Sequence, residues 1–323
     1  ILSEERGRIP NLNAYCEAFG KAFREKFYYY WKRMNMRPKM ITVIADDMDF
    51  SGIPNSITMG HALDNMMVQV FFKSPKNTTS DYRKNISSTG GYTPIHSNRF
   101  EIDITLNITC TDGNFTHPEE FEYLVDVVKA AFGHELTHAH EDMKRITGKD
   151  PEKSRMSNPD YLTRYRNKTG HVEVGDETVQ QISRMIRDAY YMMDPTETAA
   201  FLNELYVELK QIAHNYDSAQ DLYKRGIRET GTGRNLIVVH KNLKNHFGDW
   251  TPGFDKTMKQ NPKEFGDLRG VILHDINQIT GKKYDNTYSA IEGLFMQWNK
   301  FREKFLYKAR KIAADAWIET HEN

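Results

Sequence analysis

The chain has 323 residues, enough for one large domain or two ordinary ones with a substantial buried core. Lys and Arg together number 44, as do Asp and Glu, so the overall charge predicts attraction neither to nucleic acid nor to an anionic membrane. No apolar run approaches the ~18 residues that span a bilayer, so we expect no membrane-spanning helix.

The chain contains two cysteines, Cys16 and Cys110, too few for a disulfide framework or a thiolate zinc cluster. Any metal site must therefore use histidine and carboxylate side chains. Reduced thiols favour a reducing compartment, but the sequence leaves the localisation and the oligomeric state open.

The first part of the chain is predicted to contain a helix followed by a sheet. Residues 11–36 form the helix, because aromatic residues recur at spacings of three and four. They are Phe19, Phe23, Phe27, Tyr30 and Trp31. Short apolar runs follow from 39 to 110, including 40–44 and 66–72, and turn residues separate them. The clearest strand is 100–110, where every second residue is apolar, so one face should be buried and the other solvated.

A long helix is predicted to follow this strand. Thr116 and Glu119 have the spacing of a capping box, and apolar residues continue with helical spacing from Leu124 to Phe132. Thr147-Gly148 is the predicted end of the helix. The segment between Phe132 and Thr147 therefore belongs to a long, largely buried helix.

The second half of the chain is predicted to be mostly helical. Residues 149–175 are polar and indicate a loop or lid, and a helix capped by Asp176 should end at Asp194-Pro195, where the next helix begins. Beyond His214 we expect polar connections and a glycine-rich run without the Lys-Ser/Thr of a phosphate-binding loop. Residues 288–319 predict a long amphipathic helix.

His134-Glu135-Leu136-Thr137-His138 places two imidazoles one helical turn apart with a carboxylate between them. Residues i and i+4 of a helix share a face, so His134 and His138 can reach one metal ion, and zinc is the expected ion. Glu135 lies about 100° round the helix, where it can touch a water in the open coordination position. It is therefore the candidate general base.

A catalytic zinc usually takes three protein ligands, so a third must come from elsewhere. The three-histidine pattern is excluded, because Glu141 and Lys144 stand where it requires Gly and His. His140 lies on another face of the helix and is expected to be exposed. Glu197, on a later helix, is the preferred third ligand, with His171 and His214 as alternatives.

Glu197 also has a purely structural interpretation. With Asp194 as the cap and Pro195 at the first helical position, Glu197 falls at the third position. A carboxylate there favours the helix dipole and can complete a capping box. Both interpretations remain open from the sequence.

The stretch from His134 to Phe201 resembles the gluzincin branch of the zincin metallopeptidases, which combine a His-Glu-x-x-His helix with a glutamate on a later helix. The resemblance implies an α+β, zincin-like fold, with a twisted N-terminal sheet packed on the motif helix in residues 1–148. It also implies a mostly helical part, 149–323, that supplies Glu197. One departure is Phe201, where many members carry an aspartate that orients a histidine ligand. Candidates for that orienting role are Asp142, Asp188 and Asp194.

The resemblance implies a zinc-dependent endopeptidase with one Zn²⁺ bound by His134, His138 and Glu197, in which Glu135 activates the zinc-bound water for attack on a polypeptide. It also implies that substrate binds along an edge strand of the sheet between 39 and 110. The oxyanion stabiliser is not ranked by the sequence; its candidates are Tyr190, Tyr191, Tyr206 and His171.

Two other functions stay open. One is a catalytically silent zincin-like scaffold in a larger assembly, whose contacts would be made by the aromatic residues on the helices at both ends of the chain. Such an assembly could be phage-derived. The other is a metal-dependent hydrolase of non-peptide substrates.

Overall fold

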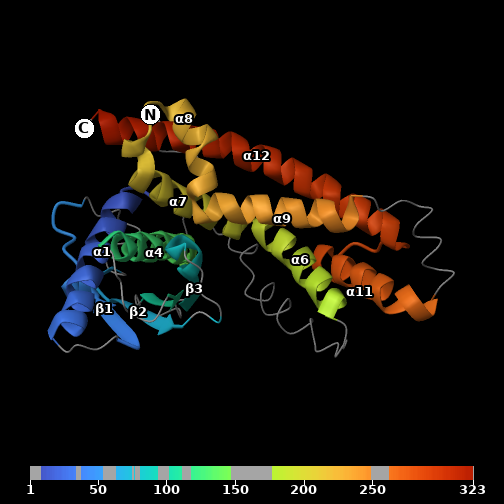
Figure 1. Cartoon of the computed structure of the whole chain (residues 1–323), viewed down its shortest axis with the longest axis horizontal. Coiled ribbons are helices and arrows are strands. Elements are labelled where there is room, and N and C mark those ends of the chain that lie inside the picture. The colour runs from blue at the N-terminus through green and yellow to red at the C-terminus, as the bar shows by residue number, and fades with distance from the viewer. Residues whose placement is uncertain are drawn as a thin grey trace. The chain divides into compact units, whose positions relative to one another are not determined.

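The computed structural model describes residues 9–33, 38–53, 63–74, 76, 81–93, 102–110, 118–146, 177–248 and 262–322. These residues form an α+β structure, with a small mixed sheet in the N-terminal part and a mostly helical remainder (Figure 1). In this described portion, no helix combines the length and the apolar character needed to cross a membrane.

The chain divides into two compact units. Unit 1 comprises Ile1–Met156, Ala199–Gly226 and Ile312–Asn323, and unit 2 comprises Ser157–Thr198 and Ile227–Lys311. One boundary falls in the first turn of helix α7 (Pro195–Ile212), so the body of this continuous helix belongs to unit 1.

The sheet of unit 1 has four strands in the order β1-β2-β4-β3. Their bounds are Met40–Ile44 for β1, Met66–Lys73 for β2, Ser87–Thr93 for β3 and Ile102–Thr109 for β4. β2 and β4 are parallel, and the other two pairs are antiparallel. The predicted alternation of β4 is confirmed, because Ile102, Ile104, Leu106 and Ile108 are buried; Phe100 lies outside the described residues. β3 was not predicted individually, since its sequence SSTGGYT lacks apolar alternation.

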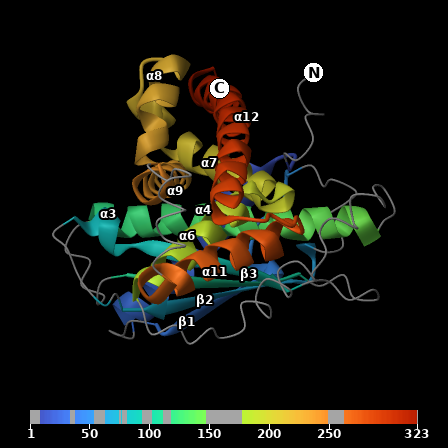
Figure 2. The same ribbon diagram turned by 90° about the vertical axis from the view of Figure 1, so that its right-hand side faces the viewer.

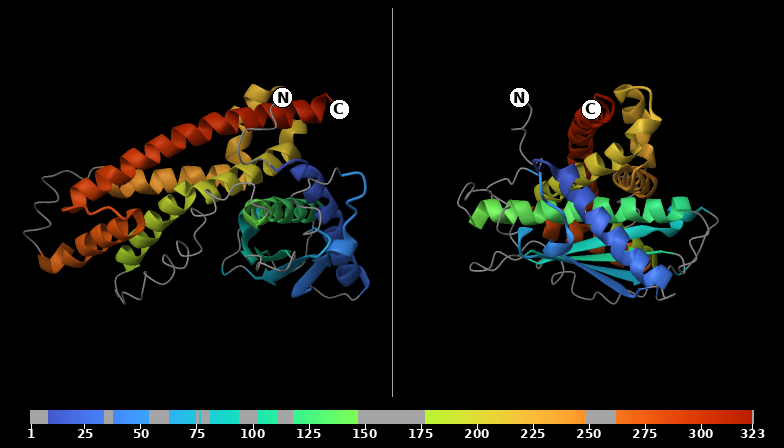
Figure 3. Two further views of the ribbon diagram at one scale, coloured as in Figure 1. Left: turned by 180° about the vertical axis from the view of Figure 1, so that it is seen from behind. Right: turned by 90° about the vertical axis from the view of Figure 1, so that its left-hand side faces the viewer.

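Two long helices cover one face of this sheet, as Figures 2 and 3 show. Helix α1 spans Leu12–Tyr28 and continues as a π-helical turn, η1, over Tyr29–Arg33. Helix α4 spans Pro118–Ile146. α1 contacts β1, whereas α4 contacts β3 and β4. The predicted starts and stops of the motif helix at Thr116 and Thr147-Gly148 lie outside the described residues.

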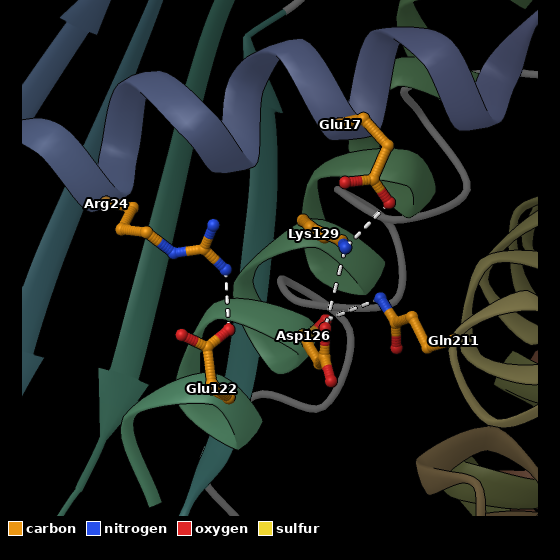
Figure 4. A network of polar contacts seen from close by, with 6 residues as sticks. All are labelled: Glu17, Arg24, Glu122, Asp126, Lys129 and Gln211. Carbon is orange, nitrogen blue, oxygen red and sulfur yellow. Dashed lines mark hydrogen bonds and ion pairs between the residues drawn. The ribbon is translucent and has the colours of Figure 1, made fainter. Parts of the chain in front are cut away.

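An aromatic and a polar contact join α1 to α4. The rings of Phe19 and Phe132 stack with centroids 4.3 Å apart, and both side chains are fully buried. Beside them, Lys129 is buried on α4 and its Nζ lies 2.7 Å from Oε1 of Glu17 (Figure 4). The alkyl stem of Lys129 packs over Gly20, where an added Cβ would lie 2.5 Å from Cδ of the lysine. These contacts fix the helix that carries the motif.

The predicted helix break at Asp194-Pro195 is confirmed. α6 spans Glu177–Met193 and α7 begins at Pro195. After them come η4 (Ala213–Asn215), α8 (Ala219–Lys224), η5 (Gly226–Glu229), α9 (Gly231–Phe247), α11 (Pro262–Thr280) and α12 (Thr287–His321). The long terminal helix is thus confirmed.

The expectation of polar connections beyond His214 is wrong, because α8, α9 and α11 occupy much of that region. α9 buries only a narrow apolar stripe, formed by Leu236, Val239, Leu243 and Phe247. Ile237 and Val238 of the same helix are exposed, so the four apolar residues in a row from 236 to 239 do not show a helical period in the sequence. In unit 2, α6 packs against α9 and α11, and Trp298 of α12 donates its indole N–H to Nδ1 of His240 on α9.

We expect Phe132→Ala to lower the free energy of unfolding by about 3–5 kcal/mol, because it removes a fully buried ring and leaves a cavity beside Phe19. Urea titration followed by circular dichroism measures this loss. Phe132→Leu is the control and should cost clearly less, since it retains most of the buried volume. Equal losses in the two variants would show that ring packing does not anchor α4.

Candidate metal centre

Helix α4 presents His134 and His138 on one face. The two ring centroids are 5.1 Å apart and the rings meet edge to face at 66°. His134 is 7% exposed and Glu135 is 5% exposed, whereas His138 is half-buried. The motif therefore faces the protein interior, as its position on a core-packed helix predicts.

Helix α7 brings Glu197 to this pair. Asp194 caps α7, since its Oδ1 accepts the backbone N–H of Thr196 at 2.9 Å and that of Glu197 at 3.3 Å. The N–H of Asp194 donates to the carbonyl oxygens of Tyr190 and Tyr191, at 3.0 and 3.2 Å. In a reciprocal capping box this N–H would donate to the side chain of Glu197. The side chain of Asp194 thus caps α7.

His134, His138 and Glu197 each offer a ligand atom, and these atoms all lie within 4.8 Å of one another. Across the part of the chain that the structure describes, this is the one such group of three. Two imidazoles and a carboxylate are the ligand set of a catalytic zinc, which keeps an open fourth position. The group could hold a metal ion, and its donor chemistry fits zinc.

Other candidate ligands are not part of this group. His214 is exposed in η4, and His171 lies outside the described residues. Both cysteines are buried, and burial raises the pKa of the Cys16 thiol far above its usual range, so it stays protonated. The donors are therefore histidine and carboxylate, as the sequence predicted.

Two residues of α7 orient His134. Nδ1 of His134 lies 3.0 Å from Oε2 of Glu204, and an ionised carboxylate can only accept, so the ring donates its Nδ1–H. The lone pair on Nε2 is then the one that can bind a metal. Phe201 meets the same ring edge to face, with centroids 5.0 Å apart. Glu204 was missed from the sequence, although its spacing of seven residues from Glu197 places both on one face of the helix.

A buried polar contact holds α7 against α4. The Thr137 hydroxyl accepts the side-chain N–H of Asn203 at 3.0 Å and donates to the carbonyl of Gly133 at 2.8 Å. Gly133 allows close approach, since a Cβ there would lie 3.2 Å from both Sγ of Cys16 and a methyl group of Val207. Thr137, inside the motif, and Gly133, just before it, thus fix the distance between the histidines of α4 and the carboxylates of α7.

The expectation that His140 is exposed is wrong. It is 2% exposed, and burial lowers its pKa to about 3, so the ring is neutral at pH 7. The prediction failed because α4 is packed on more than one face, and a residue on the face away from the ligand pair is also enclosed. His140 is not in the ligand group.

Other predicted site residues have different partners. Asp142 accepts the hydroxyl of Tyr92 on β3 at 2.9 Å. Tyr206, an oxyanion candidate, donates its hydroxyl to Glu319 on α12 and so braces the C-terminal helix instead. Tyr190 is buried and Tyr191 is exposed, and both lie on α6. The structure therefore favours none of these residues as the oxyanion stabiliser.

Comparison with protein-family models, with curated proteins and with solved structures finds no match to this chain. A function can therefore be inferred only from the chemistry of the site. The features of the site that bear on function are the group of three ligand atoms and the carboxylate of Glu204 beside His134.

We expect Glu204→Ala to weaken zinc binding about 10–100-fold, because the variant removes the acceptor that fixes the tautomer and orientation of His134. Competition with a chelator of known affinity measures the change. Glu208→Ala, one turn further along α7, is the control and should bind zinc like the unmodified protein. Unchanged affinity in Glu204→Ala would exclude the orienting role.

We expect Glu197→Gln to abolish tight zinc binding without lowering the free energy of unfolding measured in excess chelator. A carboxylate that served only the dipole of α7 would give the reverse result, a loss of about 0.3–1 kcal/mol with zinc binding unchanged. Metal analysis after dialysis and urea titration with chelator distinguish the two roles.

Proposed function

We propose that this chain is a zinc-dependent metallopeptidase of the zincin class, in which His134, His138 and Glu197 bind one zinc ion. The observation that supports the proposal is the group of three ligand atoms, which lie within 4.8 Å of one another. Beside it is the buried Glu135, which follows His134 on α4. Two histidines and a glutamate with an open position make up the zinc site of several peptidases.

Zinc, when bound, would polarise the scissile carbonyl and lower the pKa of a water at the site. Glu135 is then the general base, because it follows His134 directly and its carboxylate is enclosed rather than solvated. The carboxylate accepts a proton and later delivers it to the leaving amine. Glu204 holds the Nδ1 proton of His134 throughout, so this ring stays in one tautomer.

The substrate in this proposal is an extended polypeptide that binds along β3. This strand is last in the sheet order, and it passes directly against Glu135 at Gly90. An extended peptide can add to an exposed strand edge through main-chain hydrogen bonds. Main-chain recognition along β3 suits an endopeptidase, because it does not require a chain terminus.

We expect Glu135→Gln to retain zinc and to lower kcat by at least about 100-fold, because an amide cannot accept the proton. The measurement is cleavage of an unbiased peptide library, followed by kinetics on the best peptide and by metal analysis. Loss of zinc in the same variant would mean that Glu135 acts on the metal site and not as the base.

The same experiment separates the other functions. A zinc-loaded protein that cleaves no peptide, before or after substitution of Glu135, would favour a scaffold role. Glu135-dependent turnover of ester or amide substrates without peptide cleavage would favour a non-peptide hydrolase. A protein that binds no zinc would overturn the proposal.

A further inference from the structure

Gly90 of β3 lies in contact with the side chain of Glu135. A Cβ added at Gly90 would lie 2.1 Å from Oε1 of Glu135 and 2.6 Å from both its Cδ and its Cγ. A real Cβ does not approach a non-bonded heavy atom this closely. The carboxylate of Glu135 therefore fills the space in which any other residue at position 90 would place its side chain.

The backbone of β3 does not itself require glycine at this position. Gly90 pairs with Leu106 of β4 in a regular antiparallel ladder, and the glycines with positive φ are Gly52 and Gly281. The next residue, Gly91, points to the opposite face, and a Cβ there would meet nothing within 4 Å. Of these two neighbouring glycines, Gly90 is thus the one whose side-chain position is occupied by Glu135.

A second contact prevents β3 from moving away from α4. Tyr92 lies on the same face of the strand as Gly90, and its hydroxyl donates to Asp142 at 2.9 Å. Hydrogen bonds to β4 hold the strand along its length. A side chain at position 90 would therefore be accommodated by displacement of the Glu135 carboxylate rather than by movement of the strand.

We propose that Gly90 is a positioning residue for Glu135, and that the bare backbone of β3 fixes the place of this carboxylate relative to the ligand group. The catalytic consequence rests on the proposed function, because it requires Glu135 to be the general base. The steric relation between the two residues does not depend on any activity.

The steric relation is tested by a double-mutant cycle in the full chain, with urea midpoints as the readout. Gly90→Ala should lower the midpoint in the unmodified protein, and Glu135→Asp, which withdraws the carboxylate by one methylene, should remove most of this loss. Gly91→Ala is the matched control and should shift the midpoint equally with and without Glu135→Asp. Equal effects of Gly90→Ala in the two backgrounds would overturn the proposal.

The catalytic consequence is tested with the peptide that the unmodified protein cleaves best. Gly90→Ala should lower kcat by about 10–100-fold with unchanged KM and zinc content, because small displacements of a catalytic group are costly. Loss of zinc, or a change in KM alone, would contradict the positioning role. If the unmodified protein cleaves no peptide, the proposed function fails while the urea cycle still decides whether Gly90 positions Glu135.

Discussion

The site depends on one buried contact, the hydrogen bond between Thr137 on α4 and Asn203 on α7. Both residues are almost fully buried, and the hydroxyl of Thr137 also donates back to Gly133 within α4. An unsatisfied amide or hydroxyl in such a place costs about 1–3 kcal/mol, so the two side chains define one relative position of the helices. The candidate ligands on α4 and α7 come together because this position is fixed. Thr137 occupies a variable position of the motif, yet its hydrogen bond to Asn203 sets the position of α7 relative to α4.

The spacing of residues along α7 explains how one helix supplies both a candidate ligand and the carboxylate that orients a histidine. Glu197 and Glu204 are separated by two helical turns and face the same side, so one reaches the ligand group and the other reaches Nδ1 of His134. Phe201 lies between them and packs against the same ring. In the family that the motif resembles, an aspartate at this intermediate position orients a histidine. Here a longer side chain one turn further along α7 does so, and an aromatic ring fills the intervening space.

The parts that could be predicted from sequence are those that local chemistry determines. The apolar alternation of β4, the helical period leading into His134 and the break at Asp194-Pro195 each act within a few residues and are found as predicted. What could not be predicted depends on tertiary contacts. The sequence SSTGGYT of β3 has no apolar alternation, although Gly90 of this strand lies against Glu135, and His140 is buried although it lies on another face of α4 than the ligand pair. Gly90 and Glu135 are 45 residues apart, so no local pattern could have indicated their contact.

The proposed metal would also change the charge balance around the ligand group. Glu135 and Glu197 are each 5% exposed, and Glu204 is partly buried against His134. Burial of a carboxylate is costly unless opposite charge or hydrogen-bond donors compensate it. Under the proposed function, a divalent cation would offset two of these negative charges at once, and its binding energy would then become part of the stability of the contact between α4 and α7.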